Sequence, residues 1–176
     1  NSGLAPINYY GKSKLRGEKK ILLHNPKKSV IIRTSWLYSF HGSNFLVKIT
    51  DKLKKNREIF VVDNEVGSPT NSLDLAKTII DLIPKLSNQN TEIYHFSNLG
   101  LCSRYEFANK INEILKFDCV ITPIKQDPSQ IKRPAFSAID SSKIINDFQI
   151  FIDKWQISLK KYLKKNNEKS HDRISM

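Results

Sequence analysis

Short runs of β-branched and aromatic residues alternate along this chain with segments whose apolar residues recur at helical spacing. The run at residues 29–36 is long enough for a buried strand, whereas Phe45, Ile49 and Leu53 share one helical face. This alternation predicts an α/β fold, because helices that connect strands pack on the faces of a sheet. Helices are expected at residues 8–24, 44–56, 71–86, 103–115 and 155–165, and strands at residues 29–36, 58–63, 92–98 and 118–124.

Turn and cap residues mark the boundaries between these segments. Residues 64–70 are rich in Gly, Ser and Pro and predict a turn, and residues 126–140 predict a long irregular segment. Ser103 is followed three residues later by Glu106, the capping-box spacing that marks the start of a helix. The sequence shows no internal repeat and no linker that would split it into separate domains.

The positive charge of the chain, formally +12, is concentrated at its ends. Residues 1–30 carry seven Lys and Arg against one acidic residue, and residues 154–176 carry seven against two. Aromatic residues are not interleaved with these cations, as a groove for single-stranded nucleic acid would require. We therefore expect no nucleic-acid partner, and we expect residues 166–176 to form a disordered basic tail.

Several functional classes lack support in the sequence. No apolar run approaches the ~20 residues of a membrane span and no signal peptide opens the chain, so we expect a cytoplasmic protein without a membrane partner. Cys102 and Cys119 are interpreted as reduced thiols. Histidines at metal-ligand spacing are absent, so no metal site is predicted. None of the six glycines belongs to a G-x-G-x-x-G or P-loop pattern.

Tyr10 and Lys14 form the pair most suggestive of catalysis. Their spacing of four residues places them on one face of the first expected helix, one turn apart. A phenol has a reference pKa near ~10, and a neighbouring ammonium favours its ionised form. A carbonyl reductase needs such a proton donor, and the lysine can also bind a cofactor ribose. The pattern alone is weak evidence, because most Y-x-x-x-K pairs are surface residues.

Six ordered blocks within residues 6–146 provide a more specific signal. They read PINYYGKSKLRGEK, IIRTSWLYSFHGSNF, VVDNEVGSPTNSLDLAKTI, IYHFSN, CSRYEFA and IKRPAFSAIDSSKI. On these blocks the chain resembles the dTDP-4-dehydrorhamnose reductase family of the extended short-chain dehydrogenase/reductase superfamily. The resemblance implies the C-terminal part of an NAD(P)-binding Rossmann-like fold plus a small substrate-binding α/β subdomain. Residues 1–62 would belong mainly to the Rossmann part, and residues 63–165 mainly to the substrate-binding subdomain with returning elements.

The resemblance also implies an activity and its cofactor. The full enzyme would use NADPH or NADH to reduce the 4-keto group of dTDP-4-dehydro-L-rhamnose, a dTDP-sugar, to dTDP-L-rhamnose. Tyr10 would be the catalytic acid and Lys14 its electrostatic partner, and both would contact the cofactor. The choice between NADPH and NADH, a role for Mg²⁺ and the formation of a homodimer stay open.

Substrate contacts are implied for a further set of residues. Trp36 would pack against the sugar, residues 67–70 would form a wall of the pocket, and Asn44 would help to line it. Arg133 would bind the diphosphate through its planar fork of donors. As alternatives, Trp36 is a core aromatic, Ser68 a plain turn residue and Arg133 an exposed cation. The implied set is Trp36, Asn44, Gly67, Ser68, Thr70 and Arg133.

The chain departs from the family pattern in three respects. It has Glu65 where the family usually has glutamine, and Arg104 where the family usually has an aromatic residue. The family's N-terminal half, with its glycine-rich loop and the Ser or Thr of the catalytic triad, is not present. Because the chain begins at Asn1 and its only methionine is Met176, we expect that a preceding segment is missing. The chain by itself is therefore expected to be inactive.

Two other classes of function are considered. Some members of the superfamily are non-catalytic regulatory subunits built on the same scaffold, although the presence of Tyr10 and Lys14 favours the enzyme. A basic binding module is favoured only by the terminal lysines.

Overall fold

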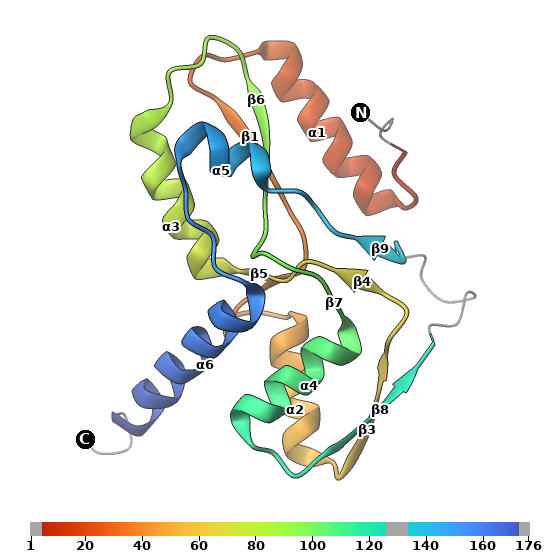
Figure 1. The fold of residues 1–176 in the computed structure, drawn as a ribbon. Helices are drawn as coiled ribbons and strands as arrows, with labels where there is room; N and C mark the ends of the chain where they lie inside the picture. The colour runs from red at the N-terminus through yellow and green to blue at the C-terminus, as the bar shows by residue number, and fades with distance from the viewer. Residues whose placement is uncertain (1–4, 126–133, 173–176) are drawn as a thin grey trace.

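The computed structural model describes residues 5–125 and 134–172, with side chains described as far as residue 165. Its helices and strands alternate along the chain (Figure 1). The helices are Tyr9–His24 (α1), Phe45–Lys55 (α2), Ser72–Leu82 (α3), Ile83–Lys85 (η1, a 3-10 helix), Arg104–Leu115 (α4), Ser142–Phe148 (α5) and Trp155–Asp172 (α6). The strands are Val30–Thr34 (β1), Leu37–Tyr38 (β2), Glu58–Val62 (β3), Val66–Gly67 (β4), Thr70–Asn71 (β5), Glu92–Phe96 (β6), Cys102–Ser103 (β7), Val120–Ile124 (β8) and Phe136–Ser137 (β9).

Most strand pairs are parallel and join segments that are distant in sequence. Strand β1 pairs with β6, β2 with β5 and β3 with β8, all in parallel. Strand β4 lies between β7, which is antiparallel to it, and β9, which is parallel to it. Parallel strands need crossover connections, and helices supply several of them here. The expected α/β fold class is therefore confirmed.

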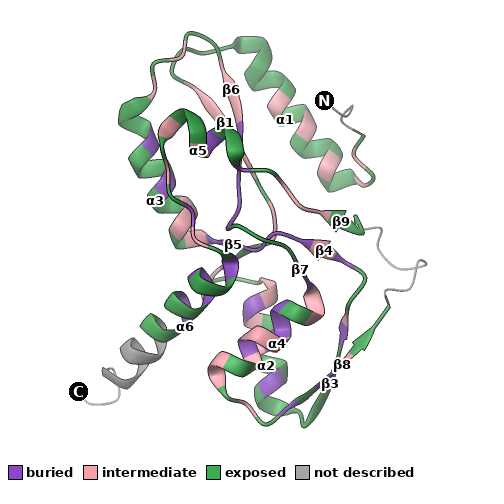
Figure 2. Cartoon of the chain, in the orientation of Figure 1, coloured by how far each residue is buried: buried purple, intermediate pink, exposed green. Residues whose placement is uncertain are grey.

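The core consists of two hydrophobic clusters. One lies among α2, α4, α6, β3 and β8, where Leu46, Phe107 and Leu159 are fully or almost fully buried. The other joins β6 to α3 and α5 through Phe96, Leu82 and Ile144. Figure 2 shows these buried residues in purple on the inward faces of the elements. The amphipathic spacing recognised in the sequence directs these side chains inward.

Packing contacts cross residue 62, the expected boundary, in both directions. Helix α2 and strand β3 precede that boundary but pack with α4 and β8, which follow it. Conversely, β6 follows it and returns to pair with β1. The lobe around β1 and β6 and the lobe around α2 and α4 are thus interleaved in sequence.

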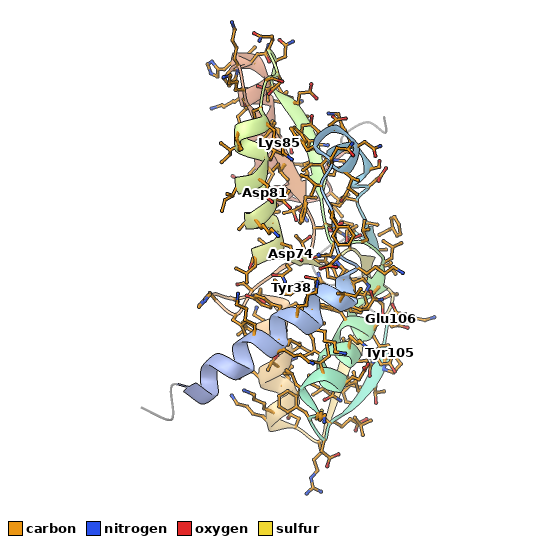
Figure 3. All side chains as sticks on the ribbon, turned by 60° about the vertical axis from the view of Figure 1, so that its left-hand side comes forward. Tyr38, Asp74, Asp81, Lys85, Tyr105 and Glu106 are labelled. Atoms are coloured by element: carbon orange, nitrogen blue, oxygen red, sulfur yellow. The ribbon has the colours of Figure 1, made fainter. Side chains whose placement is uncertain are left out.

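A buried polar junction connects the two lobes where α3, β5, β6 and α6 meet. Asp74 accepts hydrogen bonds from Asn98 Nδ2 at 2.7 Å and from Ser158 Oγ at 2.5 Å. Asn71 donates to Ser158 Oγ at 3.0 Å, and its backbone N–H donates to Asn98 Oδ1 at 2.8 Å. Figure 3 shows Asp74 on α3 beside α6, with Tyr38 close by.

Several segments differ from the expectations, and three of them illustrate the reasons. The predicted turn at residues 64–70 includes β4 and the start of β5, because these two-residue strands depend on partners elsewhere in the chain. Helix α5 was not predicted, and its seven residues are too few to give a clear periodic signal. Helix α6 continues to Asp172, within the segment expected to be a disordered tail from residue 166.

Candidate active site

Helix α1 carries the predicted catalytic pair. Asn8, two residues before Tyr10, caps the helix by accepting a hydrogen bond from Gly11 N at 2.8 Å, and the helix begins at Tyr9. Lys14 lies one turn further on, with its Nζ 5.4 Å from the centroid of the Tyr10 ring. The Tyr10 side chain is 70% exposed. Most of the surface of Tyr10 is therefore left uncovered by the rest of the chain that the structure describes.

Polar contacts hold α1 against the β1–β6 lobe. All residues of α1 are described and none of them is buried. Glu18 accepts two hydrogen bonds from Arg33 on β1, from Nε at 2.9 Å and from Nη2 at 2.6 Å. Hydrogen bonding to Glu18 raises the pKa of the Arg33 guanidinium, an effect opposed by partial desolvation. At the far end of the helix, Asn25 donates to Asn90.

Trp36 follows β1 in a left-handed backbone conformation, with φ of 42°. A bulky residue in this region is strained, so the surrounding contacts must hold it there. Its indole Nε1 donates to Ser137 Oγ at 2.8 Å. Its ring approaches Gly67 so closely that a Cβ at that position would lie 2.5 Å from Trp36 Cε2. Glycine at position 67 therefore makes room for the indole.

Arg104 covers part of Trp36. Its guanidinium carbon lies 3.5 Å from the Trp36 ring centroid and 5.0 Å from that of Phe45. Arg104 Nε also lies 3.5 Å from Glu65 Oε2, and Glu65 is only 5% exposed. Glu65 and Arg104, which both depart from the family pattern, therefore contact each other. Together they place a charged pair against the tryptophan.

A cavity of about 610 Å³ brings these groups together. Its lining includes Tyr10 from α1, Trp36 after β1, Glu65 and Arg104 from the β4–α4 region, and Ser137 from β9. A smaller cavity of about 300 Å³ adjoins α1 and includes Lys14, Glu18 and Arg33 in its lining. The predicted proton donor and the predicted sugar-contacting tryptophan therefore face one cavity.

Other predicted site residues have structural partners instead. Ser68 is buried, and its carbonyl oxygen accepts a hydrogen bond from Ser35 Oγ at 2.7 Å. Thr70 is buried and donates to the Ser35 carbonyl. Asn44 caps α2 by accepting from Val47 N at 3.3 Å. These three residues are not among the described residues that line the cavity of Tyr10. Arg133 lies outside the described residues.

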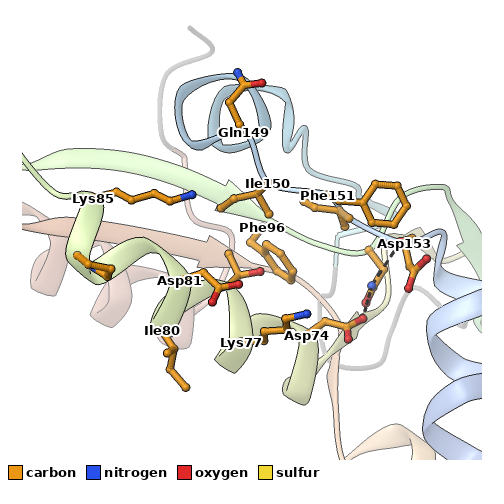
Figure 4. Close-up of a pocket in the computed structure, with 14 residues that line it drawn as sticks. Asp74, Lys77, Ile80, Asp81, Lys85, Phe96, Gln149, Ile150, Phe151 and Asp153 are labelled. Carbon is orange, nitrogen blue, oxygen red and sulfur yellow. Dashed lines mark hydrogen bonds between the residues drawn. The ribbon is translucent and has the colours of Figure 1, made fainter.

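A third cavity, of about 700 Å³, lies between α3 and residues 149–153 (Figure 4). Carboxylates and ammonium groups alternate around it, with Asp81 and Lys85 among them, and Phe151 lies at its rim. It contains neither Tyr10 nor Trp36. We therefore regard the cavity of about 610 Å³ that Tyr10 and Trp36 line as the candidate active site.

Two physical tests of the described residues are negative. No group of three or more His, Cys, Asp or Glu in these ranges could hold a metal ion. No helix among them is both long enough and apolar enough to cross a lipid bilayer.

Residues 1–168 match the family model described as the RmlD substrate binding domain. The chain belongs to this family. It is 38% identical over 166 residues to the spore coat polysaccharide biosynthesis protein SpsK of Bacillus subtilis, covering 93% of this chain and 56% of that protein. It is 39% identical over 168 residues to a dTDP-4-dehydrorhamnose reductase of Aggregatibacter actinomycetemcomitans, covering 88% of this chain and 56% of that protein.

Solved structures agree with this membership of the RmlD substrate-binding family. A Bacillus anthracis dTDP-4-dehydrorhamnose reductase in complex with NADP has a TM-score of 0.83 and 34% identity, covering 92% of this chain and 56% of that one. A Clostridium acetobutylicum orthologue has a TM-score of 0.85 and 31% identity, covering 94% and 58%. This RmlD domain thus spans little more than half the length of these relatives.

Sequence reasoning did not find the contacts of four residues that line the two cavities beside α1 in this RmlD domain. Ser137 gave no signal, because a single serine in an irregular segment has no recognisable pattern. Glu18 and Arg33 pair across 15 residues, and only the folded structure brings them together. Arg104 was noted as a departure, but its stacking on Trp36 depends on how α4 packs.

Proposed function

We propose that this chain is the C-terminal, substrate-binding part of a longer dTDP-4-dehydrorhamnose reductase. The longer protein would reduce the 4-keto group of dTDP-4-dehydro-L-rhamnose with NADPH or NADH. The observation that carries this proposal is the cavity shared by Tyr10 and Trp36. Similarity to proteins named as dTDP-4-dehydrorhamnose reductases supports the choice of substrate.

The donor set fits one end of a nicotinamide cofactor. An ammonium and a phenolic hydroxyl one turn apart can donate to the hydroxyl groups of a ribose, and the cavity of about 300 Å³ beside Lys14 offers space there. The sequence contains no glycine-rich loop for the pyrophosphate, which we assign to the rest of the longer protein. The bound cofactor would supply the hydride.

The residues of this chain supply the proton and the positioning. Tyr10 donates its phenolic proton to the keto oxygen, and Lys14 stabilises the negative charge that develops on the phenol. Trp36 and the Arg104 guanidinium stacked on it present a flat surface to the sugar on the other side of the cavity. Arg133, as a further part of the proposal, binds the diphosphate with its fork of donors.

The proposal is tested by Tyr10→Phe in the longer protein. Turnover should fall by about 10²-fold or more, because the variant keeps the ring but loses the transferable proton. The Kd for NAD(P)H should change little. Tyr9→Phe is a matched control, because Tyr9 is the neighbouring tyrosine on α1 and does not line the cavity among the described residues. Near-normal turnover of Tyr10→Phe would contradict the role of Tyr10 as proton donor, whereas no turnover by the unmodified longer protein would favour a non-catalytic subunit.

Lys14→Met extends the same test. It should reduce turnover and also weaken cofactor binding, because it removes a charge and a ribose ligand together. A variant that lost turnover but bound NAD(P)H normally would restrict Lys14 to its electrostatic role.

The 176-residue chain alone should not oxidise NAD(P)H in the presence of dTDP-4-dehydro-L-rhamnose. The reason is that this chain contains no glycine-rich dinucleotide loop. The measurement is the absorbance of the reduced nicotinamide. Sustained oxidation of NAD(P)H by the purified chain would show that the chain is active without the rest of the longer protein.

A further inference from the structure

The catalytic helix presents an electrostatic conflict. Glu18 follows Lys14 by four residues, a spacing at which opposite charges on a helix can pair. A carboxylate paired with Lys14 would draw its ammonium away from Tyr10. Within the described residues, however, no ion pair joins Lys14 to Glu18, and Glu18 is bound by Arg33 instead.

The geometry of this contact favours Arg33 over Lys14 as the partner of Glu18. Two parallel hydrogen bonds, at 2.9 and 2.6 Å, match the fork of the guanidinium to both carboxylate oxygens. The side chains are only 26% and 18% exposed, so water screens the pair less than it would a fully exposed one. Lys14 is exposed, and its ammonium lies over the Tyr10 ring.

We propose that Arg33 is a positioning residue that holds Glu18 away from Lys14, so that the Lys14 ammonium stays beside Tyr10. This inference rests on the proposed function, because it gives Arg33 a role in the proton transfer from Tyr10. It also explains why Glu18 is paired so closely with Arg33 although α1 has no buried residue.

The other charged groups that face Tyr10 form a separate pair. Glu65 and Arg104 line the same cavity as Tyr10, and they lie 3.5 Å apart. Their opposite charges largely offset one another at Tyr10. Lys14, Glu18 and Arg33 face the adjoining smaller cavity. Removing Arg33 therefore changes the charge balance around Lys14 chiefly through Glu18.

The test compares three variants of the longer protein: Arg33→Met, Glu18→Gln and the double variant. Arg33→Met exposes Lys14 to an uncompensated carboxylate, and kcat should fall by about tenfold or more, as expected for about 1.4 kcal/mol in the barrier. Glu18→Gln removes the competing carboxylate, so its kcat should stay at least about fivefold higher than that of Arg33→Met. The double variant should recover most of the kcat lost in Arg33→Met. The KM for the dTDP-sugar should change little in all three.

A purely structural anchor predicts a different pattern. Each variant breaks the same contact between α1 and β1, so an anchor would lower kcat equally in all three, and that result would overturn the inference. Thermal unfolding of each variant measures the contribution of the contact to stability separately. Lys143→Met, which breaks exposed ion pairs with Glu92 and Asp147, controls for general loss of a surface charge and should retain kcat.

A substitute variant and a parallel measurement complete this test of Arg33. If Arg33→Met does not fold, Arg33→Lys replaces it, because lysine keeps the charge but loses the fork. Adding Glu18→Gln should then restore kcat, and failure to restore it would overturn the inference. Tyr10→Phe is measured in parallel. If Tyr10→Phe keeps normal turnover, the proposed role of Tyr10 as proton donor fails, whereas an inactive Tyr10→Phe with a fully active Arg33→Met overturns only the role of Arg33.

Discussion

Trp36 is the residue whose surroundings are most specific. Its backbone is in the left-handed region, its indole N–H is bound by Ser137, and Arg104 stacks on its ring. Gly67 leaves space for the ring edge. A tryptophan fixed on several sides presents a constant shape to a ligand, which reduces the entropy lost on binding.

Gly67→Ala tests this fixation. The added Cβ would lie 2.5 Å from Trp36 Cε2 and 2.7 Å from Ser137 Oγ, so the indole must move. We expect a loss of about 1–3 kcal/mol in unfolding free energy and a weaker interaction with the dTDP-sugar. Denaturant titration and KM measure the two effects. Gly17→Ala is the matched control, because its added Cβ meets nothing within 4 Å beyond its chain neighbours and its own helix backbone, and it should be neutral or stabilising.

Arg104→Met tests the charged pair beside Trp36. The variant leaves the buried Glu65 carboxylate without the Arg104 guanidinium, which should cost on the order of 3 kcal/mol of stability. Glu65→Gln in the same chain removes the buried charge and should recover most of that loss. Denaturant midpoints of the two single variants and the double variant form the measurement. Equal stability of Arg104→Met and the unmodified chain would show that the pair contributes little.

Among the elements, α4 begins with the capping box that its sequence predicts. Ser103 Oγ accepts from Glu106 N at 3.1 Å, and Ser103 N donates to Glu106 Oε2 at 2.7 Å. Ser103 Oγ also donates to Asp63 Oδ1 at 2.6 Å, which links α4 to the end of β3. The cap therefore fixes both the start of α4 and the position of Arg104, its first residue.

Ser103→Ala should lower the free energy of unfolding by about 1–2 kcal/mol, because it removes the cap of the helix. Ser103→Thr, which keeps the hydroxyl, should retain most of the stability. Chemical denaturation of both variants makes the comparison. If the two variants lost the same amount, the hydroxyl would not be the stabilising group.

For the whole molecule, the polar junction between the lobes has the widest effect. Asn98 is completely buried, donates to Asp74 and accepts from the Asn71 backbone. Asn98→Ala leaves both partners short of a hydrogen bond, and each such buried group costs about 1–3 kcal/mol. We expect a fall of about 3 kcal/mol in unfolding free energy, measured by denaturant titration. Asn146→Ala, on the exposed side of α5, should change it by less than about 0.5 kcal/mol.

The sequence by itself determined the local features of this protein. The α/β class, the helix starts at Asn8 and Ser103, and the Tyr10–Lys14 spacing are all encoded within a few residues of the chain. Periodicity and caps act over one or two helical turns, so they can be recognised without a fold. The resemblance to the RmlD family also followed from ordered blocks, and the family match over residues 1–168 confirms it.

The tertiary structure alone decided which distant residues meet. Ser137 reaches Trp36 across 101 positions, and Arg104 reaches Glu65 across 39. The two-residue strands β4, β5 and β9 also exist only through their partners. Thr70 and Asn44 belong to recognisable motifs, yet their side chains bind backbone groups, and the backbone carbonyl of Ser68 accepts from Ser35. Such contacts depend on how strands and helices pack across the fold, and local sequence patterns carry no record of that packing.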